Sequence, residues 1–549
     1  MKEFLNMTEQ NSQAKDISSK LWDMANQLRG NMDAGEYRNY ILGFMFYRYL
    51  SEHQETYLKS QDLVELTAKQ TINEAYRQEA QGDELQDYLL DISQSLGYAM
   101  SPEYTWATIV SKVQDSTLAP SDFQAMFDDF ETNAKLNPNA RHDFQGIFTD
   151  VNLSNTRLGT TTAAKAKALS KIVELVNSFD YNDEQGHDIL GDVYEYLIAK
   201  FAGNSGKKAG EFYTPHEVSM VLAKLVTYQN QSDKHAFTVY DPAMGSGSLL
   251  LTVGNEVHGG YQHGKVQFFG QELNTTTYNL ARMNLMMHGV DYQNMTLSNA
   301  DSLEQDWPDG LDQQGIDHPR QFDAIVENPP YSAHWDNQDS KLKDPRFKDY
   351  SGLAPKSKAD YSFLLHGFYH LNETGTMAII LPHGVLFRGA KEAKIRQALL
   401  EKNQIDAIIG MPAGLFYSTG IPTVILVLKK QRVAKDVLFI DASKEFEKGK
   451  NQNKLLPSNI DKIIRTYQER KDVDKFAHVA SLAEIQENDY NLNIPRYVDT
   501  FEPEPEIDLN QVKAELAQLD QEIAQANEKF KEMASQLVET HPDKQGDNK

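Results

Sequence analysis

The stretch "VYDPAMGSGSLLLTVG", residues 239–254, joins a short apolar run to a glycine turn and then to an apolar helix. Asp241 ends the run, and Gly245 and Gly247 permit a tight turn and close approach of a ligand to the backbone. The helix that follows would offer free N–H groups at its start. No third glycine completes a dinucleotide-binding fingerprint, so the stretch alone fits a plain strand–turn–helix connection equally well.

Outward from this stretch, short β-rich apolar runs alternate with helix-like segments such as "TTTYNLARMNLMMHG". This alternation predicts a doubly wound α/β sheet, with ligands bound beyond the carboxyl ends of its strands. We expect the last strand to end near residue 430. The predicted strands lie at 237–241, 266–272, 322–328, 376–382, 405–411 and 423–430.

The regions on either side of the sheet read as helical. In "EYRNYILGFMFYRYLSEH" the apolar side chains fall on one helical face, and few strand patterns occur before residue 235. At the other end, a Pro/Glu linker precedes apolar residues spaced 3-4-3-4, which is the seam of a helix–helix contact, although one helix folded onto its own domain remains an alternative. We expect three domains: 1–180 helical, 181–500 α/β, and 501–549 linker and heptad helix. The seam residues are Leu509, Val512, Leu516, Leu519, Ile523, Ala526, Phe530, Met533 and Leu537.

Composition narrows the chemistry. None of the 549 residues is cysteine, which excludes disulfides, thiolate metal sites and a cysteine nucleophile, and we expect no metal. No apolar run is long enough to span a membrane and the N-terminus has no signal-peptide pattern, so we expect a cytoplasmic protein. The formal net charge is −25, so any contact with nucleic acid needs a local basic surface or a partner that supplies positive charge.

Two carboxylates follow predicted strands. Glu272 ends "VQFFGQE", where a carboxylate can accept both hydroxyls of a ribose. Asp301 in "LSNADSL" could accept from an adenine amine, although an exposed turn aspartate is the simpler interpretation.

The run "FDAIVENPPY", residues 322–331, ends a predicted strand with Asn328, Pro329, Pro330 and Tyr331. The Asn328 side-chain carbonyl can accept a hydrogen bond from an exocyclic amine. The prolines fix the backbone, so that the Pro329 carbonyl can accept the second hydrogen, and a base can stack on Tyr331. The tetrapeptide therefore predicts a socket for a planar –NH2 group; a rigid turn with an incidental tyrosine is the alternative.

Taken together, "EFYTP", "DPAMGSGSLL" and "NPPY", in this order, resemble the motifs of γ-type S-adenosylmethionine-dependent DNA adenine-N6 methyltransferases. Further stretches, among them "GVLFRGAKEAKIRQALLE", "GMPAGLFYSTGIPTVILVLKK" and "YNLNIPRYV", resemble the modification (M, HsdM-type) subunit of type I restriction–modification systems. The resemblance covers nearly the whole chain, and it implies a Rossmann-like methyltransferase fold. "NPPY" alone is weaker, because methyltransferases acting on protein glutamine and on RNA bases share it.

The resemblance also implies roles for individual residues. The target adenine would be flipped out of the duplex and held by Asn328, Pro329, Pro330 and Tyr331. Glu272 would bind the ribose of S-adenosylmethionine and Asp301 its adenine. His216 departs from the Arg or Lys common in relatives, which leaves a charge role there in doubt. The remaining expected cofactor residues are Glu211, Phe212, Tyr213, Thr214, Pro215, His216, Asp241, Ala243, Met244, Gly245, Ser246 and Gly247.

The expected partners follow from the same resemblance: double-stranded DNA, a specificity (S) subunit, a second M subunit and a restriction (R) subunit. The polar segment 332–360 carries six basic residues, so we expect either a solvated, partly disordered loop or a loop that orders on DNA. Two rival functions remain, methylation of a protein glutamine amide and a non-catalytic scaffold. The first is disfavoured by the long helical ends, and the second by the intact glycine loop and "NPPY".

Overall fold

The computed structural model divides the chain into two compact units, Met1–Asp499 and Thr500–Lys549. The expected boundary at residue 180 falls inside the first unit, next to residues that are not described, and stays a prediction. The structure describes residues 16–24, 26, 32, 34–67, 69–181, 189–204, 213–228, 236–257, 260–261, 264–304, 314, 319–416, 419–449, 452–500 and 509–536.

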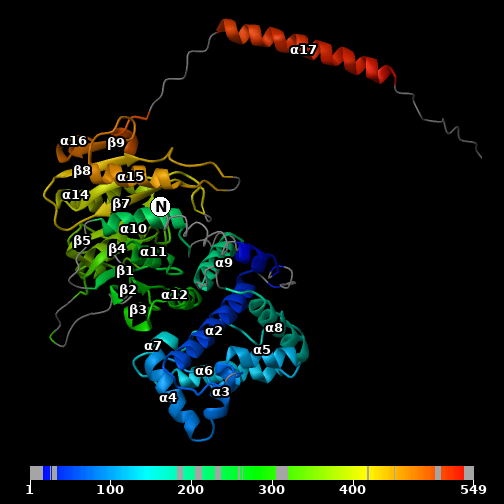
Figure 1. The fold of residues 1–549 in the computed structure, drawn as a ribbon. Coiled ribbons are helices and arrows are strands. Elements are labelled where there is room, and N and C mark those ends of the chain that lie inside the picture. Colours follow the sequence, from blue (N-terminus) through cyan, green and yellow to red (C-terminus); the bar gives the residue numbers. More distant parts are fainter. Residues whose placement is uncertain are drawn as a thin grey trace, which may run out of the picture. The chain divides into compact units, whose positions relative to one another are not determined.

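The N-terminal part of the first unit is helical, as predicted (Figure 1). Its central helix, α2, buries the expected face, including Tyr37, Tyr40, Ile41, Phe44 and Met45. Burial of these side chains contributes a few kcal/mol each, and it is this packing that holds the helix in place. The helices are α2 (Ala34–Ser60), α3 (Ile72–Glu79), α4 (Glu84–Leu96), α5 (Trp106–Gln114), α6 (Pro120–Asn133), α7 (Arg141–Phe144), α8 (Thr162–Asn177) and α9 (Leu190–Asn204).

Strands from the described part of the chain form one nine-stranded sheet of order β3-β2-β1-β4-β5-β7-β6-β8-β9. Several strands are buried along their whole length because helices cover both faces of the sheet. The strands are β1 (Phe237–Asp241), β2 (Val266–Gln271), β3 (Met295–Ser298), β4 (Phe322–Glu327), β5 (Leu371–Pro382), β6 (Ile405–Gly410), β7 (Thr423–Leu428), β8 (Asp436–Asp441) and β9 (Ala477–Ser481).

The direction of winding reverses beside β1. From β1 the chain moves outward to β2 and β3, and then returns to the other side of β1 with β4 and β5; all of these neighbours pair in parallel. Such a reversal opens a crevice at the carboxyl ends of β1 and β4, which is where ligands of doubly wound sheets bind.

Beyond β5 the sheet is mixed, and the expectation that the last strand ends near residue 430 is wrong. β7 pairs antiparallel with both β5 and β6, because the described residues of the connection from Gly410 to Thr423 form no crossover helix of the kind that parallel neighbours need. Two further strands then extend the sheet. β8 pairs in parallel with β6, and β9 pairs antiparallel with β8 and forms the edge of the sheet. β9 is short and half polar ("AHVAS"), so its sequence carries almost no strand signal.

Two layers of helices sandwich the sheet (Figure 1). One face packs against α10, α11, α12 and α15 in a core that continues into the N-terminal helices. The opposite face packs against α13, α14 and α16. Their bounds are α10 (His216–Thr227), α11 (Ser248–Glu256), α12 (Thr275–Met287), α13 (Asp360–Tyr369), α14 (Ala390–Glu401), α15 (Pro457–Glu469) and α16 (Leu482–Glu487).

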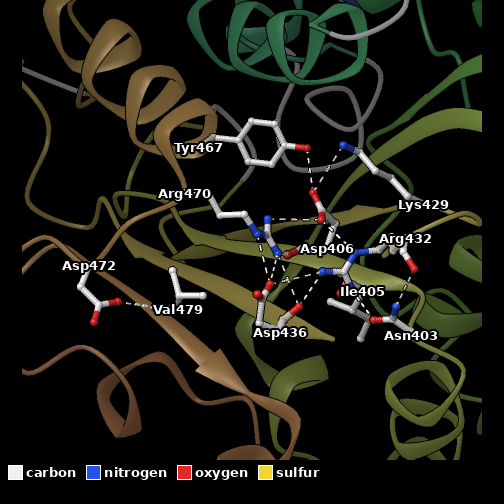
Figure 2. Close-up of polar contacts among 10 residues, drawn as sticks. All are labelled: Asn403, Ile405, Asp406, Lys429, Arg432, Asp436, Tyr467, Arg470, Asp472 and Val479. Atoms are coloured by element: carbon white, nitrogen blue, oxygen red, sulfur yellow. Dashed lines mark hydrogen bonds and ion pairs between the residues drawn. The ribbon is translucent and has the colours of Figure 1, made fainter. Parts of the chain in front are cut away.

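A cluster of charged groups ties the added strands to the rest of the sheet (Figure 2). Asp406, at the start of β6, accepts from Arg432 at 2.9 Å and from the Tyr467 hydroxyl at 2.8 Å, and pairs with Arg470 at 3.2 Å. Arg470 also pairs with Asp436 of β8 at 2.6 Å. The cluster lies at the amino end of β6, so it is separate from the carboxyl-end crevice.

The second unit contains α17 (Leu509–Ser535), which covers most of the predicted heptad seam. The seam side chains on α17 are exposed; Phe530 is 71% and Ile523 58% accessible. Leu537, the last predicted seam residue, lies outside the described residues.

Candidate functional site

Asn328 stands directly after the last residue of β4, beside β1, as predicted. Its side-chain oxygen accepts the Tyr331 hydroxyl at 2.9 Å, and its side-chain nitrogen donates to Thr214 Oγ1 at 3.0 Å. Thr214 lies just before α10, 114 residues earlier in the chain. These two bonds fix the amide with its oxygen toward Tyr331, and Thr214 therefore contacts the predicted base socket.

The Tyr331 ring has an aromatic neighbour. Phe416 lies edge-on to it, with ring centroids 6.2 Å apart and an interplanar angle of 81°. Burial raises the pKa of the Tyr331 phenol, with Asp360 adding to the effect, so the hydroxyl stays protonated and can donate. Phe416 was not predicted as a site residue; the only signal for it in the sequence is the motif "GLFYSTG" that contains it.

The glycine turn after β1 has the predicted character. Gly245 and Gly247 have φ angles of +55° and +77°, which L side chains rarely adopt. A Cβ on Gly247 would also lie 2.5 Å from Leu285 of α12. The turn thus keeps its backbone open at the carboxyl edge, immediately before the N-terminus of α11.

Glu272 reaches this turn from the neighbouring strand. One carboxylate oxygen accepts the Gly245 N–H at 3.2 Å and the other accepts the Asn274 N–H at 2.8 Å. Burial raises the pKa of Glu272, although the backbone donors oppose the rise. Each carboxylate oxygen of Glu272 retains a lone pair for a further donor. The neighbouring Leu273 is 68% exposed, so this part of the chain lies at the surface, and Glu272 could accept from the two predicted ribose hydroxyls.

Two other predicted residues make turn contacts. Asp241 is 2% exposed and accepts the Ala243 N–H at 2.9 Å. Burial raises the pKa of its carboxyl to about 8, against the opposing effect of that hydrogen bond. Asp301 accepts the Leu303 N–H at 2.9 Å, three residues beyond β3. Asp241 thus shapes the glycine turn from within, and a direct cofactor contact stays a prediction for both residues.

A cavity of about 380 Å³ lies against the residues on either side of Thr214. Tyr213, Pro215 and His216 line it together with Leu415, the neighbour of Phe416. Its other walls come from α9 and from residues 452–455. Glu211 and Phe212, also predicted to line the cofactor pocket, lie outside the described residues. Ala243, Met244 and Ser246 belong to the glycine turn, where Met244 and Ser246 are buried.

The segment 332–360 is not a solvated loop. Trp335, Phe347 and Tyr350 are buried in the core on the α13 face. Arg346 is 3% exposed and donates to Asp344 and to His366, while Lys341 pairs with Glu304 at 2.7 Å. The alternative of a solvated, partly disordered loop is therefore wrong, because apolar anchors between the lysines hold the segment, whereas the contact of this segment with DNA stays a prediction. Three of its six basic residues, Lys341, Arg346 and Lys358, contact other residues of the fold.

Among the described residues no group of three or more His, Asp or Glu side chains could hold a metal ion. No helix in the same part of the chain is long and apolar enough to cross a membrane.

The chemistry of the crevice follows from these contacts. Asn328 presents a fixed amide oxygen next to two aromatic rings, which suits a planar amine on a ring system. Glu272 and the open glycine turn lie on the two strands to one side, which suits a nucleoside with free hydroxyls. The two sites share one edge of the sheet, so ligands bound in both would meet there.

Family models and related sequences both match this chain to methylases. The N-6 DNA Methylase family matches residues 185–506, and the HsdM N-terminal domain matches residues 17–176. The type I restriction enzyme MpnII methylase subunit of Mycoplasma pneumoniae is 35% identical over 508 residues, covering 90% of this chain and 92% of the relative. The HindI methylase subunit of Haemophilus influenzae is 34% identical over 59% of this chain and 72% of its own length.

A solved structure agrees with these relatives. The methyltransferase subunit of a type I restriction-modification system from Streptococcus thermophilus superimposes with a TM-score of 0.80 at 43% identity. The match covers 88% of this chain and all of that chain.

Proposed function

The chain belongs to the N-6 DNA methylase family and, within it, to the methylase subunits of type I restriction–modification systems, and from this membership we propose that it transfers a methyl group from S-adenosylmethionine to N6 of an adenine in DNA. The site would be chosen by a partner specificity subunit. The observation that carries the proposal is the fixed Asn328 amide at the end of β4, beside Tyr331 and one strand away from the glycine turn.

The socket accounts for the amine chemistry. The Asn328 oxygen uses one lone pair for the Tyr331 hydroxyl and has a second for an amine hydrogen. The Pro329 carbonyl would accept the other hydrogen, which directs the nitrogen lone pair out of the base plane. Tyr331 and Phe416 would contact the rings of a base that has left the duplex stack, since its N6 is otherwise unreachable.

The residues around the glycine turn fit S-adenosylmethionine, which supplies an electrophilic methyl group on a sulfonium. Glu272 would accept the ribose hydroxyls, and the positive φ of Gly245 and Gly247 leaves the backbone open to the ligand. Asp301 would hold the adenine, while Tyr213, Thr214 and Pro215 would close the pocket. Positioning two reactants in one crevice is sufficient for this transfer, because it converts an encounter in solution into a reaction within one complex.

A specificity subunit would resolve the problem of net charge. With a formal charge of −25, the chain is poorly suited to bind bare duplex, since neutralisation of phosphates normally supplies most non-specific affinity. The exposed apolar seam of α17 is suited to a helix of that partner. A second copy of this chain and a restriction subunit would complete the assembly, which we place in the cytoplasm with its DNA.

The test is methyl transfer by the chain with and without the specificity subunit encoded beside it. Each preparation is incubated with labelled S-adenosylmethionine and either genomic DNA from cells lacking the system or a release-factor-like protein. The methylated nucleosides or amino acids are then identified by mass spectrometry, and the methylated DNA is sequenced. We expect N6-methyladenine at one sequence, and only with both subunits. Label in a protein glutamine instead would favour the rival substrate, and no transfer to either acceptor would favour a scaffold.

A further inference from the structure

The backbone turns sharply directly after the base socket. Ser332 follows Tyr331 and has a φ of +53°, a left-handed conformation that residues other than glycine rarely adopt. Its N–H donates to Asp360 Oδ1 at 2.7 Å. Asp360 is the first residue of α13 and is 1% exposed. A buried carboxylate therefore holds the strained residue adjacent to the tetrapeptide.

The carboxylate is itself held from the other side. Arg388 donates to Asp360 Oδ2 at 2.7 Å and to Glu392 of α14 at 3.2 Å. Arg396, one helical turn further along α14, donates to the Arg388 carbonyl at 3.0 Å. The chain of contacts thus runs from α14 through Arg388 and Asp360 to Ser332.

A backbone hydrogen bond supports the same turn. The Ala359 N–H donates to the Ala333 carbonyl at 2.9 Å, so residues 332–333 and 359–360 lie against each other. Neither contact involves the glycine turn or Glu272, so the anchor acts on the socket and leaves the expected cofactor pocket alone.

We propose that Asp360 is a positioning residue for methyl transfer, which sets the Tyr331 ring and the Asn328 amide through the Ser332 turn. The inference rests on the proposed function and assigns this new residue to its base socket. Without the carboxylate, the Ser332 N–H loses its acceptor, and the Ala359–Ala333 bond and the Lys358 contact with Ser332 Oγ are left to hold the left-handed backbone, so the turn relaxes. Displacement of a reactive group by about 1 Å can lower a rate by about 100-fold.

A purely structural role for Asp360 is the alternative, and the chain offers a matched control. Like Asp360, Asp406 is a buried carboxylate with arginine partners. It lies at the amino end of β6, away from the carboxyl ends of the strands where the socket is. Asp406→Ala should lower the melting temperature at least as much as Asp360→Ala. Only Asp360→Ala should change the rate of transfer per folded molecule.

The experiment uses the complex of this chain with its specificity subunit and a duplex containing the methylated site. We expect Asp360→Ala to lower kcat by about 10- to 100-fold, with the Kd for S-adenosylmethionine unchanged within about two-fold. Asp360→Asn keeps an oxygen for the Ser332 N–H but loses the charge that pairs with Arg388, so its kcat should lie between those of wild type and Asp360→Ala. This milder variant replaces Asp360→Ala if that variant fails to fold.

A second substitution tests the backbone step itself. Glycine adopts a positive φ without strain, so Ser332→Gly added to Asp360→Ala should recover a large part of the lost kcat. Recovery supports the positioning role, because restoring stability alone would not restore the rate per folded molecule. Unchanged kcat in Asp360→Ala, an equal loss in Asp406→Ala, or no recovery in the double variant would overturn the proposal.

The wild-type complex separates this inference from the proposed function. If the wild type transfers methyl groups to adenine and Asp360→Ala does so at the same rate, only the positioning role fails. If the wild type transfers none, the proposed function fails first.

Discussion

The Tyr331 hydroxyl donates to the Asn328 side-chain oxygen at 2.9 Å, so the predicted acceptor and the predicted stacking ring form one bonded unit. The bond leaves the amide oxygen one free lone pair, and Thr214 holds the amide nitrogen. The socket is thus preorganised before a base enters, and its parts can be tested separately.

Removing only the Tyr331 hydroxyl should have a mild effect. Tyr331→Phe keeps the ring and loses one hydrogen bond, so we expect kcat to fall by about 2- to 10-fold. Tyr331→Ala also removes a stacking surface typically worth ~1–3 kcal/mol, and DNA affinity should weaken accordingly. Steady-state kinetics of the complex gives both quantities. Equal behaviour of the two variants would contradict a stacking role for the ring.

Thr214→Val should act on the amide of Asn328. Valine has nearly the same shape and no acceptor, so the amide nitrogen is left without its partner, and we expect kcat to fall by about 10-fold. Thr214→Ser keeps the hydroxyl and is the matched control. The Kd for S-adenosylmethionine is measured in parallel by calorimetry. Weaker cofactor binding with unchanged kcat would mean that Thr214 acts only in the cofactor pocket and does not orient the amide.

Some of these contacts could be anticipated and others could not. The glycine turn, Glu272 and "NPPY" can be predicted from the local sequence, because in each case glycine, glutamate or asparagine and proline directly follow an apolar strand. Thr214 and Phe416 meet the tetrapeptide only through the fold, across 114 and 85 residues, and no local pattern pairs them.

The same distinction explains the errors in the predicted fold. The run "DVLFID" of β8 is apolar enough to be predicted as a strand, whereas β9 is too polar to be recognised from its sequence. β7 runs antiparallel because the connection that leads to it contains no crossover helix among its described residues. The anchors Trp335, Phe347 and Tyr350 are single aromatic residues in a lysine-rich segment, so their burial depends on a core that lies elsewhere in the chain.

Asp241 should make stability depend on pH. Its folded-state pKa is raised by burial to about 8, from an ordinary value of about 3.9. Its contribution to stability is therefore fully present below about pH 4 and is lost as the pH rises through about 8. Asp241→Asn keeps an acceptor for Ala243 and cannot ionise, so it should gain stability relative to wild type between about pH 4 and about pH 8, by ~1.4 kcal/mol per pH unit at most.

Thermal unfolding of the two proteins at several pH values measures this gain. Asp461→Asn, at an exposed carboxyl of α15, is the control for the loss of one surface carboxyl. A difference for Asp241→Asn that stays constant between about pH 5 and about pH 8 would show that Asp241 is already ionised in the folded protein over that range.

The seam of α17 should be required for assembly and for nothing else. Leu516→Asp with Ile523→Asp places two charges in the exposed apolar stripe, so the chain should no longer associate with the specificity subunit in size-exclusion chromatography. Gln518→Asp with Gln525→Asp makes the same change, at the same spacing, on the opposite face of the helix, and should assemble normally. Both variants should bind S-adenosylmethionine as wild type does. Assembly of the first variant would mean that the partner docks elsewhere.

The assignment of the amine to Asn328 is tested most directly by the single-turnover rate of an Asn328→Ala complex, with DNA and S-adenosylmethionine both saturating. The variant loses the acceptor at the end of β4 while Glu272 and the glycine turn remain, so the transfer rate should fall by about 100-fold or more, as expected when a reacting group loses its alignment. The Kd for S-adenosylmethionine should stay within about two-fold of wild type. A transfer rate equal to that of wild type would show that Asn328 does not hold the amine.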